Sequence, residues 1–180
     1  MKGYLKTSMI LATICAVAAL ILSSLNSVTA PVITAYEKQQ TLNALEAVNH
    51  GYEMGEKVTS DSDVSPYYIP LTENDELQGY ILELSENGYG GQISIVASYD
   101  LSGKVLEAKV VKNSETPGLG KKSENDGYMT KYIDKDPIPT KKTELSSEDS
   151  AAISGASITF AAVGKALFNG GEYIKTLEAK

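Results

Sequence analysis

The chain opens with a long run of apolar residues, and mixed, mostly polar sequence follows. Residues 9–25 read MILATICAVAALILSSL, and no charged side chain interrupts the run if it is extended to Val28. A helix of about 20 residues covers the roughly 30 Å of hydrocarbon in a bilayer. The pattern therefore predicts one transmembrane helix.

The charges that flank this run give the helix a direction. Lys2 and Lys6 precede it, and the next basic residue is Lys38. By the positive-inside rule the amino terminus lies in the cytoplasm. We therefore expect a single-pass protein of the cell (inner) membrane, with residues 31–180 on the outer side.

Two other interpretations of the apolar run stay open. Residues 28–30 (Val-Thr-Ala) have the small side chains of a signal-peptide cleavage site, but the run is longer than the ~7–15 residues usual for such a signal. Cys15 is a candidate for lipidation, although Ile14 occupies the preceding position, where a small residue is usual.

A helical pattern continues beyond the apolar run. Pro31 suits the first turn of a helix. Apolar residues then recur at the spacing of one helical face: Val32, Ile33, Tyr36, Leu42, Leu45 and Val48. We expect a stalk helix that continues the membrane helix and ends at His50-Gly51, followed by a loop over residues 53–65.

The period then changes to that of strands. Residues 77–85, 92–100 and 104–112 are three runs with partial alternation and many β-branched residues. A compact turn at residues 100–103 and a glycine-rich connection at residues 87–91 join them, and such short connections imply antiparallel order.

The remainder is irregular until a last helical pattern. Pro117, Pro137 and Pro139 interrupt the sequence after Val111, and a helix is expected from about residue 158 to 168, closed by Asn169-Gly170-Gly171. The fold class is therefore α+β, with one N-terminal transmembrane helix and an outer domain made of an antiparallel sheet and flanking helices.

The predicted domain boundaries follow from these patterns. Residues 1–30 form the cytoplasmic N-terminus and the transmembrane helix, residues 31–65 the helical stalk and loop, and residues 66–180 the outer domain.

Composition limits the chemistry of this chain. The single cysteine excludes an intrachain disulfide, a cysteine zinc site and a four-thiolate iron–sulfur cluster, and the single histidine argues against a haem, a zinc site or a histidine relay. The 23 acidic residues outnumber the 16 basic ones, so nucleic acid is not an expected partner. What remains for difficult chemistry is mostly carboxylates, hydroxyls, amines or an organic cofactor.

Two loop motifs are candidates for holding such a cofactor. Residues 115–120 (ETPGLG) follow a predicted strand, and their Pro and Gly residues allow the backbone to approach a ligand closely. Residues 154–159 (SGASIT) precede the last helical pattern, where free N–H groups and the helix dipole favour a phosphate. Taken singly, the first is typical of a turn and the second of a helix cap.

Together, the features resemble the FMN-binding domain found in the G component of the Rnf complex, a family shared with the C component of the Nqr complex. A membrane helix, GYGG at residues 88–91, ETPGLG and SGASIT follow one another in that order over nearly the whole chain. The resemblance implies one covalent FMN per chain, which a flavin transferase joins through its phosphate to the hydroxyl of Ser157. Ser157 stands where Thr is usual, Ala151 where Asp is usual and Asn113 where His is common.

The resemblance also implies cofactor-binding roles. Ser157 carries the phosphoester, Thr159 lies near the phosphate and is a second candidate for attachment, and no catalytic residue or metal ligand is implied. The other implied cofactor-binding residues are Ser154, Gly155, Ala156 and Ile158 around the attachment, and Glu115, Thr116, Gly118, Leu119 and Tyr89 around the ring and ribityl chain.

The implied function is electron relay in a membrane-bound, ion-translocating ferredoxin:NAD oxidoreductase of the Rnf type. The partners are the other membrane and redox subunits of that complex, and the chain is not catalytic alone. Covalent attachment suits an outward-facing domain, because a tether keeps the effective concentration of a cofactor high. Alternatives that stay open are the C component of a Na⁺-translocating NADH:quinone reductase, a stand-alone membrane-anchored extracellular flavoprotein, a ligand-binding domain without flavin and a structural tether.

Overall fold

The computed structural model describes residues 2–125 and 127–178. The chain divides into two compact units, Met1–Gln39 and Gln40–Lys180. Helix α1 (Lys2–Val48) runs through the first unit and into the second, and it is long and apolar enough to cross a membrane. The helical character predicted for the apolar run and the stalk is confirmed. Pro31 lies inside this continuous helix instead of starting a second one.

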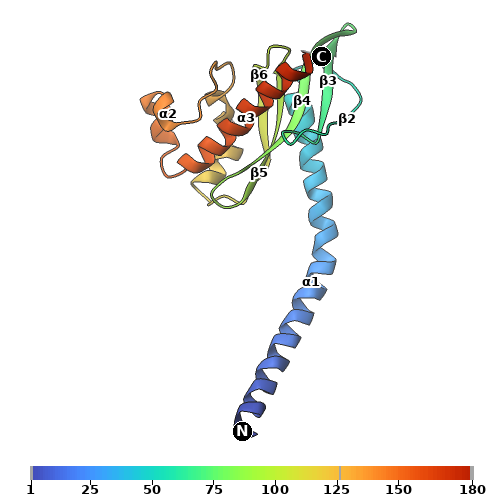
Figure 1. The fold of residues 1–180 in the computed structure, drawn as a ribbon, viewed down its shortest axis with the longest axis vertical. Helices are drawn as coiled ribbons and strands as arrows, with labels where there is room; N and C mark the ends of the chain where they lie inside the picture. Colours follow the sequence, from blue (N-terminus) through green and yellow to red (C-terminus); the bar gives the residue numbers. More distant parts are fainter. Residues whose placement is uncertain (1, 126, 179–180) are drawn as a thin grey trace. The chain divides into compact units, whose positions relative to one another are not determined.

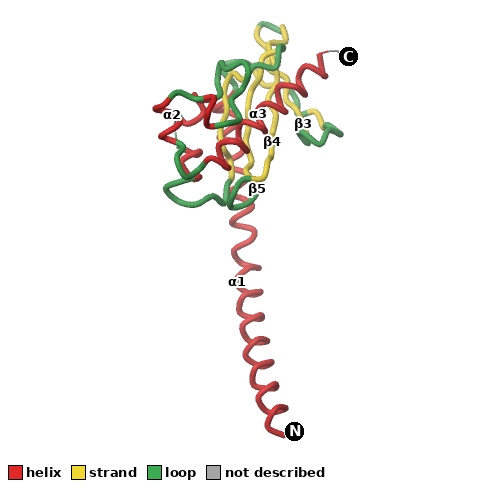
Figure 2. Tube along the Cα trace, turned by 60° about the vertical axis from the view of Figure 1, so that its left-hand side comes forward, coloured by secondary structure: helices red, strands yellow, loops and turns green. Residues whose placement is uncertain are grey.

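The second unit is built on an antiparallel sheet, drawn in yellow in Figure 2. In the described residues the order is β1-β3-β4-β5-β6, with β2 also paired to β3. The strands are β1 (Glu53–Met54), β2 (Val58–Thr59), β3 (Tyr67–Glu73), β4 (Glu76–Asn87), β5 (Gln92–Asp100) and β6 (Val105–Lys112). The three predicted strands correspond to β4, β5 and β6, and their antiparallel order is confirmed.

Strand β3 was not predicted, and the loop expected over residues 53–65 is wrong where β1 and β2 form. Pro70 hides β3 in the sequence, because proline lacks the N–H that a strand donates to its neighbour. Its carbonyl accepts a hydrogen bond from the Gly55 N–H at 2.9 Å. This edge of β3 pairs first with β2 and then with β1, and Pro70 lies between the two paired segments. The missing N–H therefore faces a gap in the ladder.

Helices cover both faces of the sheet, because its strands alternate apolar residues to each side. Helix α3 (Ser157–Glu178) lies across one face (Figure 1). The core on this face contains Leu82, Leu84, Ile93, Ile95, Tyr99, Phe160, Val163, Leu167 and Ile174. On the other face, the last turns of α1 complete a smaller core of Ala44, Val48, Tyr67, Ile69, Leu71, Ile81 and Val96.

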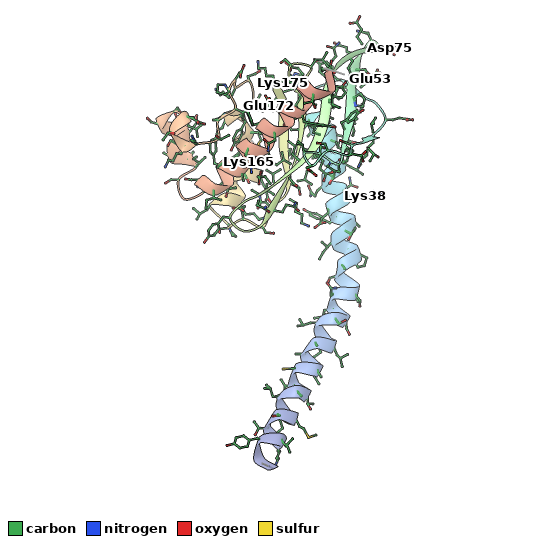
Figure 3. All side chains as sticks on the ribbon, in the orientation of Figure 1. Lys38, Glu53, Asp75, Lys165, Glu172 and Lys175 are labelled. Atoms are coloured by element: carbon green, nitrogen blue, oxygen red, sulfur yellow. The ribbon has the colours of Figure 1, made fainter. Side chains whose placement is uncertain are left out.

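Helix α3 continues past the predicted end at residues 169–171, so that prediction is wrong. Gly170 packs against the Tyr99 ring, and a Cβ on Gly171 would overlap the carbonyl of Gly103 in the β5–β6 turn. The two glycines thus allow close packing of the helix on the sheet. The opposite side of α3 carries exposed charged residues, among them Lys165, Glu172 and Lys175 (Figure 3).

Short helical turns fill the region between β6 and α3, which was expected to be irregular. They are the 3₁₀ turns η1 (Gly120–Glu124), η2 (Tyr128–Lys131) and η3 (Lys142–Glu144) and the helix α2 (Ser147–Ala152). Helix α2 was not predicted. Its N-cap is Ser146, whose hydroxyl oxygen accepts a hydrogen bond from the Asp149 N–H at 3.1 Å.

Candidate functional site

Three segments far apart in the sequence meet around one cavity of about 480 Å³. They are the β4–β5 connection, the loop that follows β6 and the first turn of α3. The lining residues are Tyr89, Glu115, Thr116, Leu119, Gly120, Gly155, Ala156, Ser157, Ile158 and Thr159. The fold thus brings together all the candidate residues except Ser154 and Gly118, which do not line the cavity.

Gly120 lines the cavity although it was not among the candidate residues. It belongs to the ETPGLG motif, so the signal was present in the sequence. What the sequence does not show is that the position faces the site: a Cβ there would meet the Glu115 carboxylate and the Thr159 hydroxyl.

The start of α3 presents Ser157 at the cavity. Gly155 adopts a left-handed conformation with φ +81°, which glycine tolerates without strain. The Phe160 N–H donates to the carbonyl of Ala156 at 2.9 Å, and Ser157 is the first helical residue and is exposed. The first N–H groups of a helix lack partners within it, so an anion near Ser157 would be stabilised.

Thr159, unlike Ser157, is buried. Its side chain is 1% exposed, and its hydroxyl donates a hydrogen bond to Oε2 of Glu115. Of these two candidate attachment residues, Ser157 is exposed to solvent, whereas Thr159 is buried and its hydroxyl is hydrogen-bonded to Glu115.

Glu115 is the buried charge of the site, with 3% of its surface exposed. Besides the bond from Thr159, its Oε1 accepts a hydrogen bond from the Gly90 N–H at 2.8 Å. Its own N–H donates to Oδ1 of Asn113 at 3.0 Å. The carboxylate therefore contacts both the β4–β5 connection and the first turn of α3.

Asn113 extends this network toward η1. Its Nδ2 donates to the hydroxyl of Ser123 at 3.2 Å, and that hydroxyl donates to the Gly120 carbonyl at 2.8 Å. Both side chains are buried. The chain of hydrogen bonds closes the ETPGLG loop on itself, which fixes the cavity wall.

The open side of the cavity is apolar. Tyr89 is 73% exposed, Ile158 55% and Leu119 40%, and each comes from a different segment of the site. Large apolar side chains exposed together mark a binding surface more often than an ordinary protein surface. A flat aromatic ligand would contact all three segments and remove this area from water.

Two lysines and one tyrosine also shape the electrostatics. Lys121 lies 2.9 Å from Glu124, so this cation is partly neutralised at the surface, and Lys122 is exposed. Tyr128 is buried, and within the described residues its hydroxyl makes no hydrogen bond. Burial raises the pKa of Tyr128; the Tyr132 side chain opposes this shift, and the negative charge of Glu115 adds to it.

Metal chemistry finds no support in the described part of the chain. No group of three or more His, Cys, Asp or Glu side chains there is arranged to hold a metal ion. The site is instead a cavity with an apolar mouth, a buried carboxylate and one accessible hydroxyl at a helix start. Such a site suits a planar organic ligand with an anionic tail.

Comparisons with known proteins agree with this description. Residues 88–170 match the profile of the FMN-binding domain. The chain is 30% identical over 162 residues to the G component of the ion-translocating oxidoreductase complex of Vibrio vulnificus, covering 80% of this chain and 76% of the relative. The matched region includes every residue that lines the cavity.

Two more relatives match almost end to end. The chain is 26% identical over 164 residues to the G component of the proton-translocating ferredoxin:NAD(+) oxidoreductase complex of Clostridium ljungdahlii, covering 90% of this chain and 86% of the relative. It is 29% identical over 187 residues to the G component of the ion-translocating oxidoreductase complex of Methanosarcina acetivorans, covering 98% and 97%. The similarity therefore extends over α1 as well as the sheet domain.

Proposed function

The chain belongs to the family of G components of ion-translocating oxidoreductase complexes, and on this basis we propose that it is the electron-relay subunit of a membrane-bound ferredoxin:NAD oxidoreductase of the Rnf type. It carries one FMN, bound through a phosphoester to Ser157. The complex couples electron transfer to ion translocation, and this chain has no turnover of its own.

The observation that carries the proposal is the position of Ser157. Ser157 is exposed as the first residue of α3 and lines the cavity that the three motifs form. Thr159, the other candidate hydroxyl in the motif, is buried and bonded to Glu115. A cofactor attached at Ser157 would lie beside the cavity that these residues line.

The residues of the site fit FMN. The N–H groups at the start of α3 would stabilise the phosphate, and Tyr89, Leu119 and Ile158 would supply apolar contacts to a flat ring. Gly155 keeps the turn before α3 small enough for close approach. Bound FMN supplies one-electron and two-electron redox chemistry that no side chain of this protein offers.

Attachment requires a second protein, a flavin transferase. A phosphoester forms when Oγ of Ser157 bonds to the phosphorus of an activated flavin nucleotide. The hydroxyl proton is lost in this step, and the nucleotide half of the donor's phosphoanhydride leaves. The exposure of Ser157 gives such an enzyme access to the folded domain.

Helix α1 anchors the chain in the cell membrane with the amino terminus in the cytoplasm. The remaining membrane and redox subunits of the complex are its partners. With the sheet domain on the outer side, a covalent bond prevents loss of the cofactor by dilution. The domain then relays electrons between neighbouring redox centres of the complex.

The test is intact mass and in-gel flavin fluorescence of the full-length chain, co-expressed with its flavin transferase and purified from membranes. We expect one FMN of added mass in the wild type and in Ser157→Thr, and none in Ser157→Ala. An adduct that persists in Ser157→Ala contradicts the site. A wild-type chain of unmodified mass contradicts covalent attachment. A flavin-carrying chain that purifies without other subunits favours a stand-alone flavoprotein.

A further inference from the structure

We infer that Glu115 is a positioning residue, whose carboxylate holds the β4–β5 connection against the first turn of α3. The inference rests on the proposed function, because the residues it positions are those proposed to hold FMN. Glu115 acts on the flavin through these neighbours.

The hydrogen bonds of the carboxylate carry the argument. Oε1 accepts from the Gly90 N–H at 2.8 Å, and Oε2 accepts from the Thr159 hydroxyl. These donors lie 25 and 44 residues away in the sequence. Burying an ionised carboxylate is costly unless hydrogen bonds compensate, so both donors are needed to keep Glu115 in place.

Glycines in both motifs make room for this carboxylate. A Cβ on Gly88 would overlap Oε1 of Glu115, and a Cβ on Gly120 would come within 2.5 Å of Oε2. Neither glycine has a positive φ, so backbone conformation does not explain them. Their role is to let the backbone approach the carboxylate closely.

Each arm of the carboxylate ends beside a residue of the proposed cofactor site. Tyr89, at the cavity mouth, directly precedes Gly90. Ser157, the proposed attachment residue, lies two positions before Thr159 on the same helical turn. A single side chain therefore fixes the distance between the phosphate end and the ring end of the cavity.

The variants at position 115 separate hydrogen bonding from charge. Glu115→Gln keeps the shape: its amide oxygen accepts from the Gly90 N–H, and its amide nitrogen donates to the Thr159 hydroxyl, which also accepts. Glu115→Asp keeps the charge but is one methylene too short to reach both donors. Glu115→Ala loses both bonds, and Glu124→Ala is a matched control because that carboxylate is exposed on η1.

The experiment is hydrogen–deuterium exchange of the full chain in detergent, with and without attached flavin. We expect exchange in residues 86–92 to be about tenfold faster or more in Glu115→Asp and Glu115→Ala, because a hydrogen bond to a charged group is lost. In Glu115→Gln and Glu124→Ala it should stay within about threefold of the wild type. In the flavin-loaded chain, iodide should quench flavin fluorescence more strongly in Glu115→Asp and Glu115→Ala than in the wild type, Glu115→Gln and Glu124→Ala.

Opposite outcomes are well separated. If Glu115→Gln behaves like Glu115→Ala, the charge and not the position of the side chain is what matters, and the inference fails. It also fails if Glu115→Ala leaves exchange in residues 86–92 unchanged. If Glu115→Ala does not fold, Thr159→Val replaces it as the test. This variant should speed exchange in residues 154–160 alone. Absence of flavin in the wild type contradicts the proposed function, while the exchange order in the unmodified chain still tests Glu115.

Discussion

The hydroxyl of Tyr99, in β5, donates a hydrogen bond to the carbonyl of Leu167, in α3, at 3.0 Å. Both side chains are fully buried, and burial raises the pKa of Tyr99 well above its ordinary value, so the donor stays protonated. The same hydroxyl occupies the space next to Gly170. The bond that holds α3 on the sheet therefore requires glycine one turn further along the helix.

This relationship predicts coupling between Tyr99 and Gly170. Gly170→Ala should destabilise the protein by about 1–3 kcal/mol through overpacking, despite the better helix propensity of alanine. Tyr99→Phe should cost about 1 kcal/mol for the lost hydrogen bond. The double variant should lose less than the sum, because phenylalanine removes the oxygen that the new methyl group meets. Denaturant unfolding of all four proteins measures this, and additivity within about 0.5 kcal/mol contradicts it.

Gly118 and Gly120 offer a matched pair in one loop. Gly118→Ala places a methyl group in open space at φ +77°, so we expect only backbone strain of about 1–3 kcal/mol. Gly120→Ala drives a methyl group into the Glu115 carboxylate, and residues 86–92 should then exchange faster, as in Glu115→Ala. Hydrogen–deuterium exchange distinguishes the two variants. Equal exchange in both would show that the space around Glu115 is not limiting.

The ion pair of Lys165 and Glu86 predicts a pH dependence of stability. Their charged atoms lie 2.8 Å apart, and the hydrogen bond from Lys165 lowers the pKa of Glu86 below its ordinary 4.5. The unfolded chain therefore binds this proton first as the pH falls, so the stabilisation is present above pH 4.5 and is lost as the pH falls through the folded-state pKa.

Lys165→Met tests this directly. The variant should be less stable than the wild type by under ~1 kcal/mol near neutral pH, since Lys165 is largely exposed. The difference should shrink toward acid pH in urea unfolding curves. A difference that stays constant with pH would instead indicate that Lys165 acts by packing its methylene groups.

Local patterns in the sequence predicted the elements whose signals are local. The alternation in β4, β5 and β6 fixes their faces, and short connections fix their order. Pro70 conceals β3, because only the gap between β1 and β2 makes proline acceptable there. The glycines at 170 and 171 mislead for a similar reason: their contacts are with Tyr99 and Gly103, far away in the sequence.

The candidate site shows the same difference between local signals and long-range contacts. The motifs that line the cavity are contiguous stretches, so their residues could be predicted together, and the fold gathers them. The burial of Thr159 and the bond from Gly90 to Glu115 depend on how the segments meet. Periodicity along one segment carries no information about a hydrogen bond to another, so the network around Glu115 emerges only from the structure.

If FMN is attached at Ser157 as proposed, Leu119 should shield it from solvent. Leu119→Ala removes apolar surface at the mouth of the cavity, so iodide should quench the flavin fluorescence more strongly than in the wild type. Leu101→Ala is the control, because Leu101 is similarly exposed, at 37% against 40%, but lies in the β5–β6 turn and does not line the cavity. Equal quenching in both variants would place the ring outside the reach of Leu119.

The single cysteine of the chain makes its orientation in the membrane measurable. Cys15 lies within the apolar part of α1, so Cys15→Ser gives a background in which one new cysteine reports one position. In intact cells, a membrane-impermeant maleimide should label Asp61→Cys, in the polar segment before β3, and should label Tyr4→Cys only after permeabilisation. The reverse pattern contradicts an outer location of the sheet domain.

The intact mass of the purified protein tests whether residues 1–30 are removed. A mass that corresponds to a chain beginning at Pro31 would identify them as a cleaved signal peptide, in which case α1 does not anchor the mature protein.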